Sequence, residues 1–259
     1  MTAPTLPPFF SVHWFETVGS SNDDARSLAE SGAPEGTLVW AGEQTAGRGR
    51  RGRGWSSPPG NLYLSLVLRP NVDMTMAPQL GFVCAIALGE AVAGSIPDGA
   101  ARVRYKWPND LLIDGAKTAG ILLESGPSVT LAERVVGPAY VIAGMGTNIA
   151  SAPSDTPYPA TCLSEAGAPN LTPAALLERF ARHFEAGYRI WQDDGFERVR
   201  GSWLAAGHRS GDPLTVRIGG GEMVSGRFLD LCSDGALLLE LASGETRRIS
   251  AGDVAMMAA

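Results

Sequence analysis

Cysteine and histidine are scarce in this 259-residue chain, which contains three of each. The cysteines, Cys84, Cys162 and Cys232, are odd in number and widely spaced. This pattern excludes a disulfide framework and the paired spacing of a zinc site, and it is typical of reduced cytoplasmic thiols. We therefore expect a cytoplasmic protein with no metal site built from its own side chains.

Long hydrophobic runs and clustered charge are also rare. The most apolar stretch, residues 80–92, is interrupted by Gly81, Gly89 and Glu90, so it is too short and broken to span a bilayer. No positively charged segment precedes an apolar run at the N-terminus, which argues against a signal peptide. Charged residues make up 19% of the chain and the formal net charge is −6. Because phosphate neutralisation needs clustered Lys and Arg, we expect no nucleic-acid partner and no membrane partner.

Strand and helix signals are interspersed over the first 207 residues. Alternating hydrophobicity and turn residues predict strands over residues 12–17, 37–43, 61–69, 102–107 and 139–144, and a hairpin over residues 111–123. Helices are predicted over residues 24–29 and 76–93. Thr172 and Pro173 are expected to cap and begin another helix, whose apolar stripe is Leu176, Leu177, Phe180, Phe184, Tyr188 and Trp191, and a further helical piece should run to about residue 206. Because helices and strands do not alternate strictly, the predicted fold class is α+β, with a mixed or antiparallel sheet and packed helices.

After the last predicted helix, the sequence pattern changes from helical periodicity to short alternating segments. Short strands over residues 214–218, 223–231, 236–241 and 246–250 are separated by tight glycine turns. This pattern predicts a small C-terminal all-β domain of SH3-like size. We place the domain boundary near residues 207–211, which gives domains over residues 1–207 and 208–259.

An arginine- and glycine-rich loop joins two of the predicted apolar strands. It reads Gly-Arg-Gly-Arg-Arg-Gly-Arg-Gly-Trp over residues 47–55. Glycine lets the backbone fold closely around a ligand, and arginine supplies charged, bidentate donors for phosphate or carboxylate. A flexible solvated loop and an RNA contact are alternatives. The position inside a compact domain of an acidic protein favours a ligand-binding loop.

Three further motifs follow the loop. Lys106-Trp107-Pro108-Asn109-Asp110 lies at the end of a predicted strand, and Lys117-Thr118-Ala119-Gly120 lies on the return strand of a hairpin around Asp114-Gly115. That hairpin should bring Lys117 back beside residues 106–110. The third motif, Gly144-Met145-Gly146-Thr147-Asn148, is predicted to be a turn after a strand. Alone, each motif is compatible with a plain turn or a solvated strand face.

In their order along the chain, GRGRRGRGW, KWPNDLL, KTAGILLE and GMGTN resemble the biotin–protein ligase family. The resemblance covers residues 20–148 by motif and the remainder by layout, and it implies the biotin/lipoate ligase catalytic fold. It also implies that ATP activates biotin as biotinyl-5'-AMP, which then biotinylates a lysine of a biotin carboxyl carrier protein domain of a carboxylase. Only 19 residues precede Ser20, so we expect the ligase form without an N-terminal DNA-binding domain. Monomer and homodimer both stay open.

The resemblance assigns a first group of residues to biotin. The ureido end would be bound by Gln44 together with Ser20, Ser21 and Asn22, although the family usually has threonine at the place of Ser21. The loop that closes over biotin and the adenylate phosphate would be formed by Gly47, Arg48, Gly49 and Arg50. Gly120 would permit a close approach of the backbone.

The resemblance assigns a second group to ATP and catalysis. The adenosine pocket would be formed by Trp55, Asn109 and Asn148. Lys106 and Arg50 would contact phosphates, and Lys117 would meet both the biotin carboxylate and the α-phosphate. Asp110 would orient or deprotonate the incoming lysine amine.

Elementary electrostatics agrees with this chemistry. A carboxylate and a polyphosphate repel each other, so fixed cations, with Mg²⁺ carried on the phosphates, would stabilise the transition state. No covalent nucleophile is needed, and we expect Cys162 and the three histidines to be structural or solvated. Two rivals remain. A lipoate–protein ligase would need an apolar pocket, and a non-enzymatic nucleic-acid binder would not depend on Lys117 or Gln44.

Overall fold

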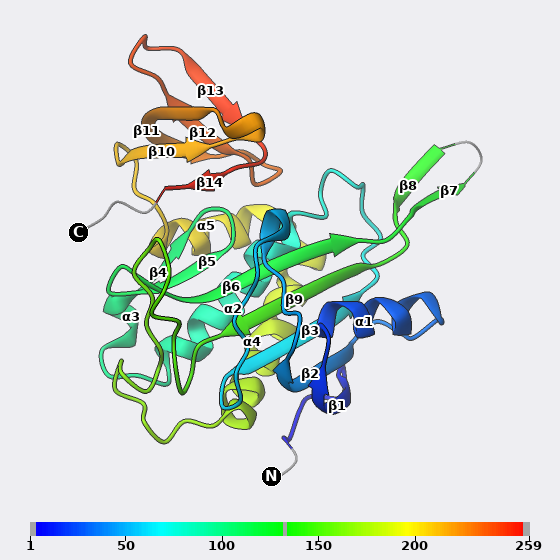
Figure 1. The fold of residues 1–259 in the computed structure, drawn as a ribbon. Coiled ribbons are helices and arrows are strands. Elements are labelled where there is room, and N and C mark those ends of the chain that lie inside the picture. The colour runs from blue at the N-terminus through cyan, green and yellow to red at the C-terminus, as the bar shows by residue number, and fades with distance from the viewer. Residues whose placement is uncertain (1–3, 132–133, 256–259) are drawn as a thin grey trace.

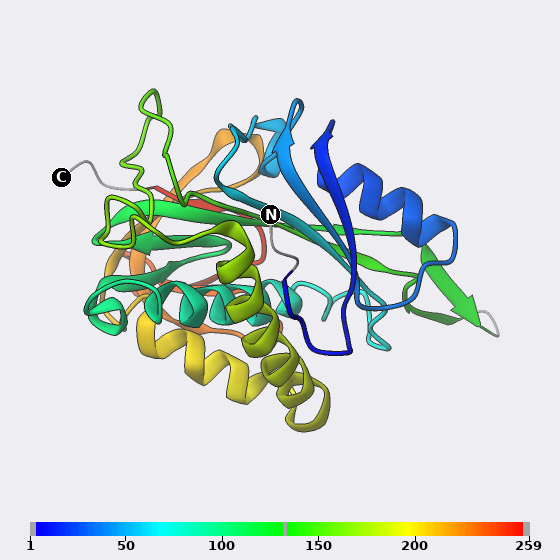
Figure 2. The same cartoon turned by 90° about the horizontal axis from the view of Figure 1, so that it is seen from below.

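The computed structural model describes residues 4–131 and 134–255, which form a seven-stranded sheet with helices, a separate five-stranded sheet and a two-stranded sheet over residues 128–138 (Figure 1). Helices α2, α4 and α5 lie together on one face of the large sheet, and α1 lies on the other (Figure 2). The elements of this larger part are β1 (Ser11–Val18), α1 (Ser21–Glu30), β2 (Thr37–Gln44), β3 (Leu62–Leu68), α2 (Gln79–Ala93), α3 (Gly99–Arg102), β4 (Val103–Lys106), β5 (Asp110–Ile113), β6 (Ala116–Ser125), β7 (Ser128–Leu131), β8 (Arg134–Pro138), β9 (Val141–Thr147), α4 (Pro173–Asp194) and α5 (Phe196–Ala206).

The large sheet is mixed. Its order is β1-β2-β3-β9-β6-β5-β4. Strands β1 and β2 are parallel and are connected through α1, because parallel neighbours need a crossover, whereas the other neighbours pair antiparallel. This arrangement confirms the α+β class predicted from the irregular order of strands and helices.

Strand β3 is buried on both faces. Its four leucines, at alternate positions 62–68, join the core beneath α2 and α4, as the alternation predicts. The residues between them are buried too: Val67 packs with Ala25 and Ala29 of α1, and Tyr63 packs with Val18 and Ala41. A second apolar layer therefore covers the opposite face, and it also encloses the polar Ser65.

The strand predicted to end at Gly144 continues three residues further, so the predicted turn is wrong for Met145, Gly146 and Thr147. Gly144 to Thr147 continue strand β9, which pairs with β3 on one side and with β6 on the other. Two-sided hydrogen bonding outweighs the local turn preference of glycine. Glycine inside a strand often marks the close approach of another group, and this explanation applies here.

The hairpin between β5 and β6 follows its turn chemistry. Asp114 and Gly115 both have positive φ, 49° and 81°, as a two-residue type I′ turn requires. The return strand places Lys117 opposite Leu112, after a register shift near Leu111. The hairpin thus brings Lys117 back to Asp110, as the sequence predicts.

Helix α4 also forms as predicted. The Thr172 hydroxyl accepts a hydrogen bond from Ala175 N at 3.2 Å, and Pro173 occupies the first turn. The predicted apolar stripe is buried over its whole length: Leu176, Leu177, Phe180, Phe184, Tyr188 and Trp191.

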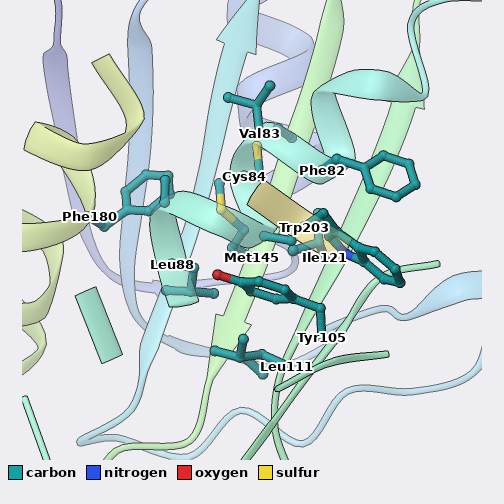
Figure 3. Close-up of a cluster of buried hydrophobic side chains, with 14 of the residues drawn as sticks. Phe82, Val83, Cys84, Leu88, Tyr105, Leu111, Ile121, Met145, Phe180 and Trp203 are labelled. Atoms are coloured by element: carbon teal, nitrogen blue, oxygen red, sulfur yellow. The ribbon is translucent and has the colours of Figure 1, made fainter. Parts of the chain in front are cut away.

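The core between helices and sheet fixes which way the strand residues point. Ile121 of β6 and Met145 of β9 project into this core, among side chains of α2, α4 and α5 (Figure 3). Because side chains alternate along a strand, the neighbouring residues Gly120, Gly144 and Gly146 face the opposite side of the sheet. That side carries the candidate site.

The small sheet has the order β13-β12-β11-β10-β14, with elements β10 (Pro213–Arg217), β11 (Met223–Leu231), β12 (Leu237–Glu240), β13 (Thr246–Ile249) and β14 (Asp253–Val254). Four of these strands were predicted; β14 was missed because two residues carry no periodicity. The small sheet contacts the large part through Trp107 Nε1, which donates to Gly235 O at 3.0 Å, and through Phe82, which lies against Gly235. Within the described residues, no helix combines the length and apolar character needed to cross a membrane.

Candidate active site

A flat floor of three glycines lies at the centre of the site. A Cβ at Gly146 would come within 2.4 Å of Trp55 Nε1, and a Cβ at Gly144 within 2.0 Å of Asn22 Oδ1. A Cβ at Gly120 would lie 3.2 Å from Trp55 Cζ3. The glycines of β6 and β9 therefore leave room for two side chains that lie directly on the strands.

One end of this floor is formed by polar side chains that carry no charge. Gln44 Oε1 accepts from Ser21 N and Ser21 Oγ at 2.9 and 3.0 Å. The buried Ser65 hydroxyl lies 2.7 Å from Ser21 Oγ and 2.6 Å from Asn22 Oδ1. Asn22 Nδ2 donates to Glu124 Oε2 at 2.6 Å, so the orientation of this amide is fixed from both ends. The network offers preorganised donors and acceptors in a confined space.

The arginine loop folds back on itself as a small hairpin above the floor. Trp55 N donates to Gly47 O at 2.9 Å, and Gly49 N donates to Arg53 O at 2.6 Å. The reversal is made by Arg51 and Gly52, with φ of 57° and 72°. Glycine adopts this left-handed conformation at little cost, which explains one glycine of the motif. Gly47 serves packing, because a Cβ there would lie 2.6 Å from Trp55 O.

All four arginines of the loop have carboxylate partners within the protein. Arg48 pairs with Asp23 at 2.7 Å and lies 3.6 Å from Glu124, and its hydrogen bond holds the pKa of Asp23 below the ordinary value. The three others converge on one carboxylate, that of Asp253: Arg50 at 2.9 Å, Arg51 at 3.4 Å and Arg53 at 3.0 Å. Carboxylates of the protein itself therefore offset part of the positive charge of this loop.

Two lysines and one aspartate form a buried cluster at the other end of the floor. Asp110 Oδ1 lies 2.6 Å from Lys117 Nζ, and Asp110 Oδ2 lies 2.8 Å from Lys106 Nζ. Burial raises the pKa of Asp110, but the two lysines outweigh burial and hold the pKa below its ordinary value. The carboxylate therefore stays ionised, and it aligns both ammonium groups without cancelling the net positive charge of the cluster.

Trp55 links this cluster to the loop. Lys117 Nζ lies 5.4 Å from the ring centroids of both Trp55 and Tyr158. The indole N–H of Trp55 is buried and has no hydrogen-bond partner among the described residues. A ligand with an acceptor atom at this point would satisfy it.

Most of the residues predicted from the sequence line one pocket. Its walls include Ser20, Ser21, Asn22, Gln44, Arg48, Gly49, Arg50, Trp55, Asn109, Lys117 and Gly120. Asn148 lies instead beside a neighbouring depression that shares Trp55 and Lys117, and its Nδ2 donates to Thr161 O at 3.1 Å. Lys106 and Asp110 lie behind Lys117 and are almost fully buried. Lys106 Nζ also donates to Val254 O of the small sheet at 3.1 Å.

Sequence reasoning missed five residues of the site. Ser57 accepts from Gln44 Nε2, Ser65 and Glu124 hold Asn22, Tyr158 borders Lys117, and Asp253 binds the arginine loop. Only Glu124 carried a usable signal, since it lies in the KTAGILLE segment. Across the described ranges, no group of three or more His, Cys, Asp or Glu could hold a metal ion.

The remaining candidate side chains have structural settings. Cys162 is buried, and burial raises the pKa of its thiol, which disfavours a reactive thiolate. His208 Nε2 accepts from Trp107 N at 3.2 Å between the rings of Trp203 and Phe228. Burial lowers the pKa of His208 to about 4.

Taken together, the pocket has a neutral polar end, a flat floor and a cationic end. Such a site fits an elongated ligand with a hydrogen-bonding head, and it can lower the repulsion between two anions brought together near Lys117. The arginine loop lies above the floor, where it would cover such a ligand.

Two family models match the chain. The first, described as Biotin/lipoate A/B protein ligase family, matches residues 54–205, and the second, described as Biotin protein ligase C terminal domain, matches residues 210–257. Among curated relatives, the bifunctional ligase/repressor BirA of Bacillus subtilis is 35% identical over 246 residues, covering 93% of this chain and 72% of the relative. The biotin–(acetyl-CoA-carboxylase) ligase of Paracoccus denitrificans is 40% identical over 235 residues, covering 87% and 92%.

Solved structures agree with these relatives. The biotin protein ligase of Leishmania major in complex with biotinyl-5-AMP is 29% identical with a TM-score of 0.59, over 95% of this chain and all of that chain. The ligase of Aquifex aeolicus in complex with biotin and ATP has a TM-score of 0.76 over 95% and 97% of the two chains, and at 24% identity it supports the fold alone.

Proposed function

The chain belongs to the biotin/lipoate A/B protein ligase family, and from this premise we propose how its residues carry out the ligation of biotin to protein. The activity is ATP-dependent biotin–protein ligation. The biotin carboxylate attacks the α-phosphorus of ATP, the bond to the β-phosphate breaks, and pyrophosphate leaves. The amine of an acceptor lysine then attacks the acyl carbon, loses a proton and releases AMP.

The observation that carries the assignment of roles is the polarity of the pocket. The neutral end, with Ser21, Asn22, Gln44 and Ser65, suits the ureido head of biotin, which needs donors and acceptors but carries no charge. The cationic end, with Lys117, suits the carboxylate and the α-phosphate. In this arrangement the reacting atoms meet beside the lysine cluster, where fixed charge is worth most.

The adenosine moiety is assigned to the side of the floor covered by Trp55. Two observations support this assignment: the buried indole N–H has no hydrogen-bond partner in the described part of the chain, and Asn109 and Asn148 lie nearby. Arg50 would then lie above the phosphate and retain the adenylate. Lys106 would act through Asp110, because its ammonium is buried against that carboxylate and the Val254 carbonyl.

Asp110 is proposed to orient the incoming amine and to balance the lysines. Its pKa lies below the ordinary value, so it is a weak proton acceptor in the free enzyme. The proton of the acceptor amine would more readily leave to solvent or to the departing phosphate. Of the two roles predicted for Asp110, the geometry therefore favours orientation over deprotonation.

Mg²⁺ would enter with the ATP phosphates. The described residues offer no cluster of three metal-binding side chains, and the negative charge that would hold the ion comes from the substrate. When bound, the ion supplies positive charge to the departing pyrophosphate. Biotin carboxyl carrier protein, the substrate implied by relatives that act on acetyl-CoA carboxylase, is the proposed acceptor. We propose cytoplasmic action, consistent with free Cys84, Cys162 and Cys232.

The neutral end of the pocket also argues against a lipoate–protein ligase. A lipoate ligase must enclose an apolar dithiolane ring, and burying unpaired amide and hydroxyl groups against such a ring is costly. Ser21, Asn22, Gln44 and Ser65 would all face that ring. Nucleic-acid binding through the arginine loop is disfavoured because its arginines already have carboxylate partners at Asp23 and Asp253.

The assignment is tested by labelling an isolated biotin carboxyl carrier domain. The purified chain is incubated with the domain, Mg·ATP and either biotin or lipoate, and the mass of the acceptor is measured. A mass increase of one biotin, dependent on ATP and absent when the acceptor lysine is replaced by arginine, supports the proposal. Labelling with lipoate in place of biotin would refute it.

A further inference from the structure

The last strand of the small sheet reaches the arginine loop and the lysine cluster together. Asp253 accepts from Arg50 Nη1 at 2.9 Å and from Arg53 Nη2 at 3.0 Å, and its carboxylate lies 3.4 Å from Arg51. On either side of it, Gly252 O accepts from Arg50 Nη1 at 2.9 Å and Val254 O accepts from Lys106 Nζ at 3.1 Å. Three consecutive residues thus contact four cations, one of which, Arg50, the proposed function places above the phosphate.

The contacts leave part of Arg50 available to a ligand. Within the described residues, every side-chain hydrogen bond of Arg50 runs through Nη1, so Nη2 and Nε remain uncommitted. Arg50 also lies in the wall between the biotin pocket and a cavity of about 540 Å³ that extends between the two sheets. A guanidinium fixed at one nitrogen can present the others in a defined direction.

Electrostatics explains why a carboxylate is needed to hold Arg50 in place. Burial lowers the pKa of Arg50, Asp253 opposes that shift, and the neighbouring Arg51 and Arg53 add to it. Without the negative charge, three guanidinium groups at one point would repel each other, and the loop, whose glycines give it little stiffness, could spread away from the pocket. The Asp253 side chain is 19% exposed, so solvent screens this repulsion only in part.

Resting on the proposed function, we infer that Asp253 is a positioning residue of the ligase reaction: it holds Arg50 over the adenylate phosphate from the small C-terminal sheet. The C-terminal sheet is therefore part of the active site, although Asp253 itself does not line the biotin pocket. Asp253 acts through Arg50 and touches neither substrate nor reacting atoms.

The test compares Asp253→Asn with the unaltered full-length chain in biotin-dependent exchange of pyrophosphate into ATP. We expect the KM for ATP to rise about tenfold, as for the loss of one charge-assisted contact, with a smaller change in kcat and in the KM for biotin. Spontaneous release of biotinyl-adenylate, measured by filtration of preloaded enzyme, should accelerate by a similar factor. Asp253→Glu restores the charge and should recover most of both values.

The matched control is Asp230→Asn. Asp230 also belongs to the small sheet and pairs with Arg200 of α5, so this variant breaks an ion pair between the same two parts of the chain without touching the arginine loop. Thermal unfolding of both variants, followed by tryptophan fluorescence, checks that each is folded. A larger KM for ATP in Asp253→Asn than in Asp230→Asn supports the inference.

Three results would overturn it. These are unchanged values for Asp253→Asn, equal changes in the two variants, or a lower KM for ATP, which would mean that Asp253 competes with the nucleotide. The unaltered chain tests the proposed function separately. If it catalyses no biotin-dependent exchange, the ligase assignment fails, whereas an active unaltered chain with an unaffected variant refutes only the role of Asp253.

Discussion

Replacing one of two glycines on one strand should weaken the binding of ATP, and replacing the other should weaken the binding of biotin. Gly144 and Gly146 lie two residues apart on β9 and face the same side of the sheet. A Cβ at position 146 would meet the Trp55 indole, and a Cβ at position 144 would meet the Asn22 amide. Neither glycine has a positive φ, so alanine fits the backbone at both positions and the effect is confined to these contacts.

The size of the effect follows from the distances. At Gly146 the new methyl group would lie 2.4 Å from Nε1 and 2.6 Å from Cε2 of Trp55, whereas carbon contacts relax at roughly 3.5–4.0 Å. The indole must therefore move by about 1 Å or more. Such overpacking costs about 1–3 kcal/mol, and because Trp55 lies on a loop, most of this cost should fall on ligand binding. We expect the KM for ATP to rise about five- to thirtyfold in Gly146→Ala.

The Gly144→Ala variant is the matched comparison. Its methyl group would displace Asn22, which is held by Ser65 and Glu124, and should raise the KM for biotin more than that for ATP. Steady-state pyrophosphate exchange, with biotin and ATP varied in turn, measures both constants, and circular dichroism confirms folding. Should both variants raise the two KM values in the same ratio, the division of the floor into a biotin half and a nucleotide half would be refuted.

Three further predictions concern other parts of the molecule. Lys117→Ala should lower the rate of biotin-dependent pyrophosphate exchange about a hundredfold or more while the fold survives, because Asp110 keeps its contact with Lys106; exchange within a few-fold of the unaltered rate would exclude Lys117 from adenylation. The native pKa of His208 is about 4, below its ordinary 6.5, so its neutral form stabilises the fold above pH 6.5 and that contribution is lost as the pH falls from 6.5 towards 4. Urea unfolding should show up to about 3 kcal/mol of stability lost over this range, and His208→Gln should flatten the slope; an unchanged slope would contradict the assignment. Trypsin should cleave the loop at Arg50, Arg51 and Arg53 more slowly once biotin and ATP are bound, since the ligand adds counter-charge; equal cleavage with and without ligand would count against closure over the adenylate.

The sequence predicted those features that depend on local chemistry. The Asp114-Gly115 turn fixed a two-residue hairpin, and that hairpin alone determines that Lys117 returns to Asp110. The amphipathic stripe of α4 and its Thr172 cap were equally local. In each of these cases the information lies within a few residues, so propensity and periodicity were sufficient.

The features that escaped prediction depend on neighbours distant in the chain. Gly144 to Thr147 carry turn-forming residues, yet β3 and β6 pair with them from both sides and convert them to strand. Ser65 gave no signal in the sequence, because nothing local reveals that α1 covers that face of β3. Asp253 belongs to a two-residue strand with no pattern of its own, and its three arginine partners lie about 200 residues earlier.

The change from helices to short strands near residue 207 marks a boundary in the sequence pattern, but residues from both sides of that boundary contribute to the site. If the chain is divided there, Arg50 loses the Gly252 and Asp253 acceptors, Lys106 loses Val254 O, and Trp107 Nε1 loses Gly235 O. Lys106 is a buried cation and Trp107 is a fully buried ring, and leaving their N–H groups without partners is costly. The segment from Lys106 to Asp110, which determines where the lysine cluster lies, thus depends on contacts from the small sheet. Both sheets hold the site, because the arginines and lysines gathered there lie close together only where carboxylates and carbonyls from distant parts of the chain offset their charge.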